Sequence, residues 1–330
     1  MRLIHAARTV QTSSAGVSFR AGDGLAGLEG SLVALVTPFR DGHVDDDALS
    51  ALCERQVQRG SAGLVVCGST GEAPALLADE HMRVVGIAAE AVAGRIPVIA
   101  GCGAPSTDTA VALARVTVRS GADALMCAPP PYVRPTQDGI VAHIRAVADA
   151  ACCPVILYDV PGRTGVSVSD ATVARLHGQG MICGLKDAAG DLSRPVRLRA
   201  LCGEGLLQVS GDDATAGAYR AMGGHGCISV TANLLPALCA RMHRAWTIGD
   251  LQDFARLRDL LAPLHLALQQ EANPIPVKAA LSLAGLCRGD LRLPLTRATT
   301  DTLDRLAALL PDLFAAEEDA ARAPRLSVVV

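Results

Sequence analysis

The chain has 330 residues, enough for one large α/β barrel or for two ordinary domains with a substantial core. Its net charge of −3 argues against electrostatic binding to nucleic acid or to an acidic membrane surface, so a small-molecule partner is expected. The eleven cysteines are odd in number and form neither a CxxC pair nor zinc-ligand spacing, which argues against a disulfide framework or a metal site and fits a reducing cytoplasm.

The first 28 residues contain serine and arginine with little acid and lack the apolar core of a secretory signal. They could pass for a weak organelle-targeting segment, but we expect a disordered N-terminal extension over residues 1–28 or a start codon placed too early. No apolar run approaches the roughly 18 to 20 residues needed to cross a bilayer. We therefore predict a cytoplasmic protein without a membrane span.

Between residues 29 and 232, short apolar runs alternate with helical patterns. Continuous rather than alternating apolar strands, each followed by a helix, indicate a parallel sheet that is covered on both faces. Eight such units predict an α/β fold, a (β/α)8 TIM barrel, as the catalytic domain. The expected strands are 32–36, 63–67, 97–100, 124–127, 155–158, 182–186, 207–210 and 226–230, with helices including 46–59, 79–93, 107–120 and 137–151.

After residue 232 the strand pattern stops. Helices are expected at 234–247, 251–269, 274–286 and 301–316. We predict a C-terminal helical region over residues 233–318 and a loosely ordered tail over residues 319–330.

Only two of the thirty basic residues are lysines, Lys186 and Lys278. Lysine loses its proton when desolvated, whereas arginine stays charged, so both lysines are candidates for amine chemistry unless codon bias left them at random. Lys186 ends the sixth strand, and barrel active sites lie at the carboxyl ends of the strands. Lys278 falls in a predicted helix behind Asn273-Pro274-Ile275-Pro276, where a capping or packing role is expected.

A lysine at a barrel mouth can condense with a ketone once its pKa of about 10.4 is lowered, and the imine then serves as an electron sink. The alternative is an exposed lysine at a strand end. The chain has three tyrosines, of which Tyr158 ends the fifth strand and Tyr132 lies in a proline-rich loop. Phenols at these places could relay protons, although Tyr132 could also be a surface residue, and Tyr219 is expected to pack within a helix.

Two further features could hold carboxylates. The turn Gly68–Glu72 offers backbone N–H groups and the hydroxyls of Ser69 and Thr70, a receptor for a small carboxylate. Arg163, after the Tyr158 strand, could clamp a second carboxylate, although a lone loop arginine is often only solvated. Gly211-Asp212-Asp213 resembles a metal-binding pair, but no further carboxylates or histidines lie near it in the sequence. We therefore interpret it as a turn and helix cap and predict no metal site.

The chain from about Gly30 to Thr296 resembles the dihydrodipicolinate synthase (4-hydroxy-tetrahydrodipicolinate synthase) family, within the pyruvate-dependent lyase superfamily that includes N-acetylneuraminate lyase. The matching segments, in order, are GSLVALVTPF, GSTGEA, RIPVIAGCGA, the YxRP loop, ILYDVPGRTG, GLKDAAGD, SGDDATA, GGHGCISVTAN, NPIPVK and LRLPLT. The resemblance implies a class I lyase that condenses pyruvate with aspartate semialdehyde in the diaminopimelate and lysine pathway, with no cofactor beyond a lysine Schiff base.

The resemblance also implies roles for individual residues. Lys186 would form the imine with pyruvate, Tyr158 would shuttle protons, and Ser69 would relay them together with Tyr132 from a neighbouring subunit. The enzyme would then be at least a homodimer, and a homotetramer is expected. The N–H groups of Ser69 and Thr70 would bind the pyruvate carboxylate, and Arg163 would bind the carboxylate of the semialdehyde. The backbones of Gly211 and Ile228 would line the pocket.

The sequence departs from the family in two places. The relay hydroxyl is Ser69 where the family usually has threonine, and we expect activity to survive. The positions that form the allosteric site in lysine-inhibited members are Ala78, Pro105, Thr109 and Pro131, with only His81 retained. This predicts weak or absent feedback inhibition by lysine.

Two alternatives stay open. One is a related aldolase acting on a sugar-derived 2-oxo acid, on N-acetylneuraminate or on hydroxy-oxoglutarate. Arg163 favours the semialdehyde reaction, because an acceptor that carries a carboxylate needs a cation and a polyhydroxy chain does not. The other is an inactive barrel kept as a binding protein. The intact Lys186, Tyr158 and Tyr132 argue against such decay.

Overall fold

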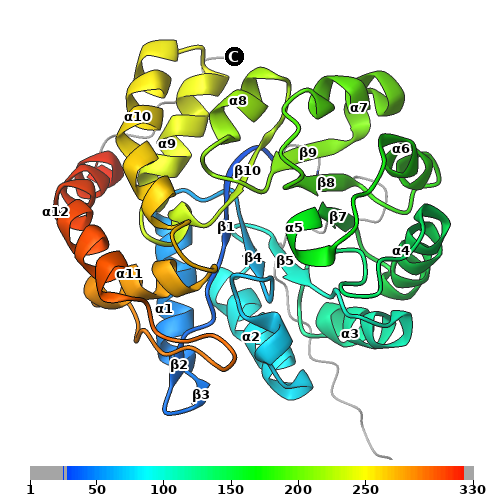
Figure 1. Ribbon diagram of the computed structural model, residues 1–330, viewed down its shortest axis with the longest axis horizontal. Helices are drawn as coiled ribbons and strands as arrows, with labels where there is room; N and C mark the ends of the chain where they lie inside the picture. Colours follow the sequence, from blue (N-terminus) through cyan, green and yellow to red (C-terminus); the bar gives the residue numbers. More distant parts are fainter. Residues whose placement is uncertain (1–24, 26–27, 323–330) are drawn as a thin grey trace, which may run out of the picture.

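The computed structural model describes residue 25 and residues 28–322 (Figure 1). Within these residues eight parallel strands close into a barrel in the order β1-β10-β9-β8-β7-β6-β5-β4, which confirms the predicted fold. Strand β1 closes the ring by pairing with both β10 and β4. The strands are β1 (Gly30–Ala34), β4 (Gly63–Val66), β5 (Val98–Gly101), β6 (Ala124–Cys127), β7 (Val155–Asp159), β8 (Gly184–Asp187), β9 (Leu207–Ser210) and β10 (Gly226–Ser229).

Helices surround the strands (Figure 1). Those between successive strands are α1 (Asp46–Gln58), α2 (Ala78–Val92), α3 (Thr107–Arg119), α4 (Gln137–Ala151), α6 (Asp170–Gly178), α7 (Arg194–Cys202) and α8 (Ala216–Ala221). The four that were predicted by range, α1 to α4, agree with the structure to within one residue at each end, and three of them begin at a capping side chain. Asp45, Ser106 and Thr136 cap α1, α3 and α4 by accepting a hydrogen bond from an N–H group of the first turn.

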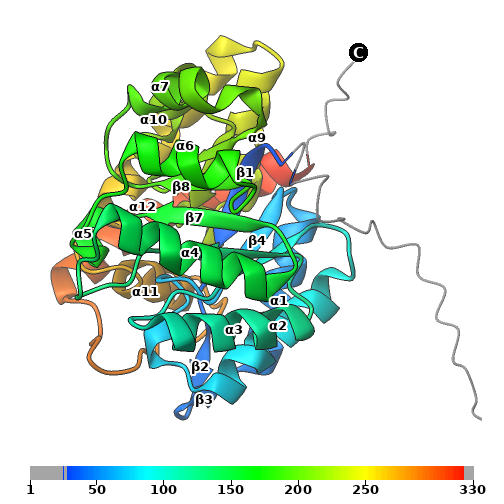
Figure 2. The ribbon, with the colours of Figure 1, turned by 90° about the vertical axis from the view of Figure 1, so that its right-hand side faces the viewer.

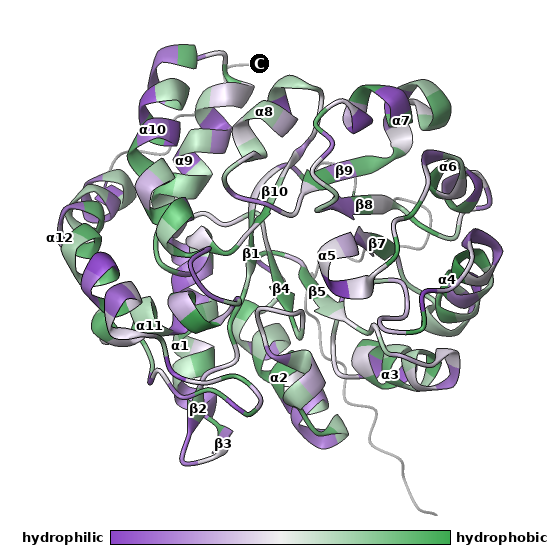
Figure 3. Cartoon of the chain, viewed as in Figure 1, coloured by the Kyte–Doolittle hydropathy of each residue, from purple (hydrophilic) through white to green (hydrophobic). Residues whose placement is uncertain are grey.

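The barrel strands are buried on both faces, which explains their continuous apolar sequences. One face packs against the helices, which carry both hydrophilic and hydrophobic stripes, as α4 and α10 (Leu251–Ala267) show in Figure 3. The other face fills the barrel with side chains such as Leu32, Val65 and Ile156. Leu25 and Leu28 are buried against this interior cluster, although both belong to the predicted extension. The rest of that extension lies outside the described residues.

A short hairpin follows β1 and was not predicted. Its strands are β2 (Phe39–Arg40) and β3 (His43–Val44), paired antiparallel. The connecting Asp41 and Gly42 both have positive φ values, 54° and 85°, as a tight two-residue hairpin turn requires. Strands of two residues are too short to produce a detectable period.

The C-terminal region is helical, as predicted, with α9 (Pro236–Thr247), α10, α11 (Ile275–Leu283) and α12 (Thr300–Arg322). Helix α9 packs on β1 and so completes the barrel's alternation of strands and helices. The remaining short elements are α5 (Pro161–Thr164) and the 3-10 helices η1 (Ala73–Ala75), η2 (Gly203–Gly205) and η3 (Thr231–Asn233).

Helix α12 runs further than predicted. Residues 319–322 are helical, so the expectation of a loose tail from residue 319 is wrong for these four, and residues 323–330 lie outside the described part. The buried Glu317 accepts hydrogen bonds from the N–H groups of Ala237 and Leu238, at 3.0 and 2.9 Å, at the start of α9. A carboxylate on free helix N–H groups is stabilising, and it fastens the last turns of α12 to the barrel.

Candidate active site

Lys186 and Tyr158 lie side by side on neighbouring strands. The register of β7 and β8 pairs Tyr158 with Lys186, and both side chains face the barrel interior. Lys186 is only 4% exposed, and its Nζ lies 4.2 Å from the centroid of the Tyr158 ring, a cation–π distance. The amine and the phenol that the sequence singled out are therefore adjacent at the carboxyl ends of the barrel strands.

Arg194 holds the next residues of the same strands, Asp159 and Asp187, on the opposite face of the sheet. Its Nη1 donates to Asp159 Oδ2 at 2.7 Å and to Asp187 Oδ1 at 3.2 Å. Burial raises the pKa of both carboxyls, and the guanidinium acts in the opposite direction. One buried arginine thus joins the ends of the two strands, one residue beyond Tyr158 and Lys186. Sequence reasoning did not find this residue.

The Gly68–Glu72 turn follows β4 and brings Ser69 and Thr70 to the same cavity. Thr37 Oγ1 donates to the Gly71 carbonyl at 2.7 Å, and Asn273 Nδ2 donates to Thr70 Oγ1 at 2.9 Å. Among the backbone hydrogen bonds of the described residues, the N–H groups of Ser69 and Thr70 have no acceptor. Two such free N–H groups in a turn suit a small anion such as a carboxylate.

Arg163 lies in α5, directly after β7, and lines the cavity. Its Nη2 donates to the Asn273 carbonyl at 3.1 Å, so α5 and the segment before α11 meet at the same end of the barrel (Figure 2). An arginine at this place can receive a carboxylate on two parallel N–H bonds.

Gly211 and Ile228 differ in how close they come to the cavity. Gly211 lines it. A Cβ there would lie 2.9 Å from the Ala188 Cβ, closer than real Cβ contacts, and 3.2 Å from Lys186 Cε, so a larger residue would crowd the lysine. Ile228 is 1% exposed and lies lower, among the interior side chains of the barrel. From its strand, the residues that line the cavity are Val230 and Thr231 just beyond the end of β10.

The cavity above Lys186 encloses about 220 Å³. Its walls combine the strand ends with residues of α10 and of the segment that follows it. The lining residues are Ser69, Thr70, Tyr158, Val160, Arg163, Lys186, Ala188, Gly211, Asp212, Asp213, Val230, Thr231, His265, Leu268, Gln269 and Asn273. Such a space, with a buried amine at the floor and a guanidinium at the side, suits a small polar acid.

Residues 27–313 match the model of the dihydrodipicolinate synthetase family. The chain belongs to this family. A 4-hydroxy-tetrahydrodipicolinate synthase of Rhodospirillum centenum is 50% identical over 283 residues, which cover 86% of this chain and 97% of that protein.

Two solved structures agree with this placement. The 4-hydroxy-tetrahydrodipicolinate synthase of Methylacidiphilum fumariolicum SolV has a TM-score of 0.85 at 34% identity, covering 88% of this chain and 99% of that one. The chloride-inhibited dihydrodipicolinate synthase of Acinetobacter baumannii, complexed with pyruvate, has a TM-score of 0.84 at 40% identity, covering 87% and 99%. The predictions of family and fold are confirmed, and the names of these relatives support the predicted activity.

Tyr132, the remaining residue of the relay expected for this family, lies apart from the cavity. It is 94% exposed, has a positive φ of 74° and is not among the residues that line the cavity of its own chain. The family-based expectation that Tyr132 serves a neighbouring subunit is compatible with this position and stays a prediction.

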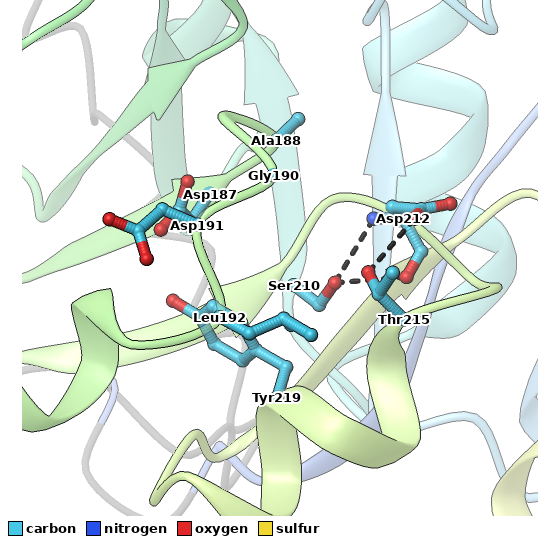
Figure 4. Close-up of a pocket in the computed structure, with 9 residues that line it drawn as sticks. All are labelled: Asp187, Ala188, Gly190, Asp191, Leu192, Ser210, Asp212, Thr215 and Tyr219. Carbon is cyan, nitrogen blue, oxygen red and sulfur yellow. Dashed lines mark hydrogen bonds between the residues drawn. The ribbon is translucent and has the colours of Figure 1, made fainter.

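A smaller cavity of about 160 Å³ lies beside the first and shares Ala188 and Asp212 with it (Figure 4). Thr215 Oγ1 donates to Asp212 Oδ2 at 2.8 Å. The Asp212 side chain of the predicted turn Gly211-Asp212-Asp213 is therefore bound to the residue just before α8. Tyr219, expected to pack within a helix, lies in α8 and is 3% exposed. Burial raises the pKa of its phenol. Nothing places this tyrosine in the cavity above Lys186.

The residues that sequence reasoning missed come mostly from the C-terminal region. His265, Gln269 and Asn273 line the cavity, although they lie more than 75 residues after Lys186 in the chain. Gln269 Nε2 donates to Asp212 Oδ1 at 3.0 Å. Of these three residues, only Asn273 belongs to a segment that resembles the family, NPIPVK.

Other features of the described residues bear on the predictions. Among these residues, no group of three or more His, Cys, Asp or Glu side chains is arranged to hold a metal ion. Over the same part of the chain, no helix is both long and apolar enough to cross a membrane.

Asp213, the last residue of the predicted turn, accepts hydrogen bonds from the N–H groups of Val230 and Thr231, at 2.8 and 3.1 Å, and thus secures the end of β10.

The positions that the family resemblance assigns to the allosteric site of lysine-inhibited members offer few hydrogen-bonding partners. Ala78, Pro105 and Thr109 are exposed, and the Thr109 hydroxyl lies 2.8 Å from that of Ser106. His81 is 4% exposed, with its Nε2 3.1 Å from Thr117 Oγ1, and burial lowers its pKa. The retained histidine is therefore directed into the core.

Proposed function

We propose that the protein is a 4-hydroxy-tetrahydrodipicolinate synthase that condenses pyruvate with aspartate semialdehyde through a Schiff base on Lys186. The observation that carries this proposal is the position of Lys186, buried beside Tyr158 on the floor of a cavity whose walls hold Arg163 and the Ser69–Thr70 turn. The product, 4-hydroxy-tetrahydrodipicolinate, belongs to the diaminopimelate and lysine pathway. The imine on Lys186 would serve as the electron sink, so we propose that the reaction needs no separate cofactor.

The reaction would begin with pyruvate held by its carboxylate on the N–H groups of Ser69 and Thr70. The Lys186 amine attacks the ketone carbon, and loss of water leaves an imine. The imine withdraws electrons, so the pyruvate methyl group loses a proton and becomes the nucleophile. Tyr158 lies against the amine and would carry protons to and from these intermediates, together with Ser69 and Tyr132.

The acceptor would be aspartate semialdehyde. Its aldehyde carbon is attacked by the enamine, and its carboxylate would bind Arg163, whose exposed guanidinium lines the cavity. Ring closure by the amine of the acceptor then releases Lys186. A polyhydroxy aldehyde would leave Arg163 without a charged partner, which disfavours the sugar-derived alternatives. Glyoxylate, the aldehyde formed from hydroxy-oxoglutarate, carries a carboxylate and is distinguished by the acceptor assay.

We also place the enzyme in the cytoplasm as a homo-oligomer. The eleven cysteines are odd in number and have no CxxC or zinc-ligand spacing, a pattern that fits a reducing compartment. The exposed Tyr132 supports an assembly in which one subunit completes the site of another, with a dimer as the minimum and a tetramer expected.

Borohydride trapping tests the proposed chemistry. Incubation with pyruvate and borohydride, followed by peptide mass mapping, is expected to give a reduced pyruvate adduct on the peptide that contains Lys186. Lys278 is the internal control, because it is the only other lysine and is 0% exposed. No adduct on Lys186 would contradict the Schiff-base proposal.

The acceptor is tested separately with a coupled assay that compares aspartate semialdehyde with N-acetylmannosamine, glyceraldehyde and glyoxylate. We expect the highest kcat/KM with the semialdehyde. A higher value with any of the other three would assign the chain to a different reaction of the same superfamily.

Lysine is expected to inhibit weakly or not at all. The ammonium and carboxylate of lysine need charged or hydrogen-bonding partners, and Ala78, Pro105 and Pro131 supply none from their side chains. Initial rates measured against a lysine titration, with a lysine-inhibited family member in parallel, should stay unchanged up to millimolar lysine. Half-inhibition at a sub-millimolar concentration would show that another site binds the amino acid.

A further inference from the structure

The second lysine of the chain forms a buried ion pair with the last residue of the Gly68–Glu72 turn. Lys278 Nζ lies 2.7 Å from Glu72 Oε1, and the two side chains are 0% and 1% exposed. The other carboxylate oxygen, Oε2, accepts from the N–H group of Arg292 at 3.0 Å. The packing role predicted for Lys278 is confirmed by its burial, but its partner was not predicted.

An aromatic ring completes the surroundings of this pair. The Lys278 ammonium lies 4.2 Å from the centroid of the Phe39 ring, and the guanidinium of Arg292 lies 4.4 Å from the same centroid. Burial lowers the pKa of Lys278, and the neighbouring Glu72 carboxylate acts in the opposite direction. The pair is therefore enclosed by a hydrogen bond, an aromatic face and protein packing, without contact with solvent.

The carboxylate holds the turn in a backbone conformation that needs support. Glu72 has φ 52° and ψ 35°, the left-handed region that non-glycine residues seldom occupy. Its N–H group donates to the Ser69 carbonyl at 3.2 Å, so the orientation of Glu72 is coupled to that of Ser69. Such strained residues persist where the surroundings fix them, and they gather at ligand clamps.

The same segment that carries Lys278 also holds the middle of the turn. Asn273, five residues earlier, donates to Thr70 Oγ1, and α11 begins between them. The turn is thus gripped at Thr70 and at Glu72 by the C-terminal region, while Thr37 holds Gly71 from the other side. Ser69 and Thr70, with their free N–H groups, are left facing the cavity.

We infer that Lys278, acting through Glu72, is a positioning residue that keeps the Ser69–Thr70 turn oriented to receive the carboxylate of the 2-oxo acid. This inference rests on the proposed function. A buried ion pair is by itself weak evidence for stability, because apolar residues of similar volume often replace one without loss. Here lysine is kept in a chain that otherwise uses arginine almost throughout, and its carboxylate partner ends the turn that faces the amine of Lys186.

The test uses the full-length double variant Glu72→Gln/Lys278→Met, which removes both charges while keeping similar side-chain volumes. The N–H groups of the turn bind the pyruvate carboxylate in the ground state and in the transition state alike, so the pyruvate KM should rise by a larger factor than kcat falls. A fall in kcat would report displacement of the Ser69 hydroxyl from the proton relay. We expect the half-saturating pyruvate concentration, for turnover and for borohydride trapping on Lys186, to rise about tenfold or more, with trapping still complete at saturating pyruvate.

Glu317→Gln is the matched control. Like Glu72, Glu317 is a fully buried carboxylate near basic side chains, in this case Arg55 and Arg59, but it holds α12, away from the turn. It should lower the melting temperature and leave the pyruvate dependence unchanged. If the double variant folds poorly, Glu72→Gln alone keeps the shape and an acceptor oxygen for Lys278, and its pyruvate KM should rise several-fold in the same direction.

The outcomes separate the inference from the proposed function. If the wild-type protein gives no adduct on Lys186, the proposed function fails. If the wild-type protein is trapped, and the folded double variant or Glu72→Gln shows the wild-type pyruvate dependence, the positioning role of Lys278 is overturned. A rise in pyruvate KM equal to that of Glu317→Gln would also overturn it, because a purely structural role would then suffice.

Discussion

Replacing Lys186 by arginine is expected to reduce kcat by about 10⁴-fold or more, the scale of loss when a covalent nucleophile is removed. Arginine keeps a positive charge near the Tyr158 ring but cannot supply a neutral amine for the ketone carbon. The variant should therefore lose the chemistry and not merely the electrostatics. The measurements are steady-state turnover with both substrates and borohydride trapping with pyruvate.

The variant Lys186→Met provides the comparison, because it removes the charge and keeps an unbranched side chain of similar length. Both variants should give no trapped adduct and should melt near the wild-type temperature if the site residue carries chemistry and not stability. Activity of Lys186→Arg within tenfold of wild type would mean that the reaction does not pass through an imine on this residue.

Much of the barrel could be predicted from sequence because its signals are local. Runs such as 124–127 are apolar at every position, since both faces of a parallel strand are buried, and helices such as α3 begin at a capping serine. The β2–β3 hairpin gave no such signal in two-residue strands. The predicted helix over 301–316 ends too early, because the last turns of α12 are held by Glu317, which binds the start of α9 about eighty residues earlier in the chain.

The site shows the same division. Lys186 and Tyr158 were found because both are rare in this sequence and both end barrel strands, and the register of β7 and β8 then makes them neighbours. No local sequence motif distinguishes Arg194 from the other 27 arginines. Its role appears only when the fold brings Asp159 and Asp187 to the same guanidinium. Asn273 and Glu72 were hidden for the same reason, since each acts across about two hundred residues.

Replacing Tyr132 by phenylalanine is expected to lower kcat by about 10²- to 10³-fold, the usual contribution of one proton-transfer group. The ring is kept, so a surface that uses it for packing should be preserved. Tyr132 is 94% exposed and is held at a positive φ of 74°, a strained conformation for an aromatic residue in a monomer. Both features are explained if the phenol enters the cavity of a neighbouring subunit.

Mixed oligomers distinguish this arrangement from one in which the tyrosine acts within its own chain. In a dimer that combines Tyr132→Phe with Lys186→Arg, one site receives an intact Lys186 and an intact Tyr132, and the other site receives neither. After unfolding and refolding of an equal mixture, about a quarter of the wild-type activity should return, since half of randomly paired dimers are mixed. If tagged mixed dimers are isolated and remain as inactive as either parent, Tyr132 does not complete its neighbour's site.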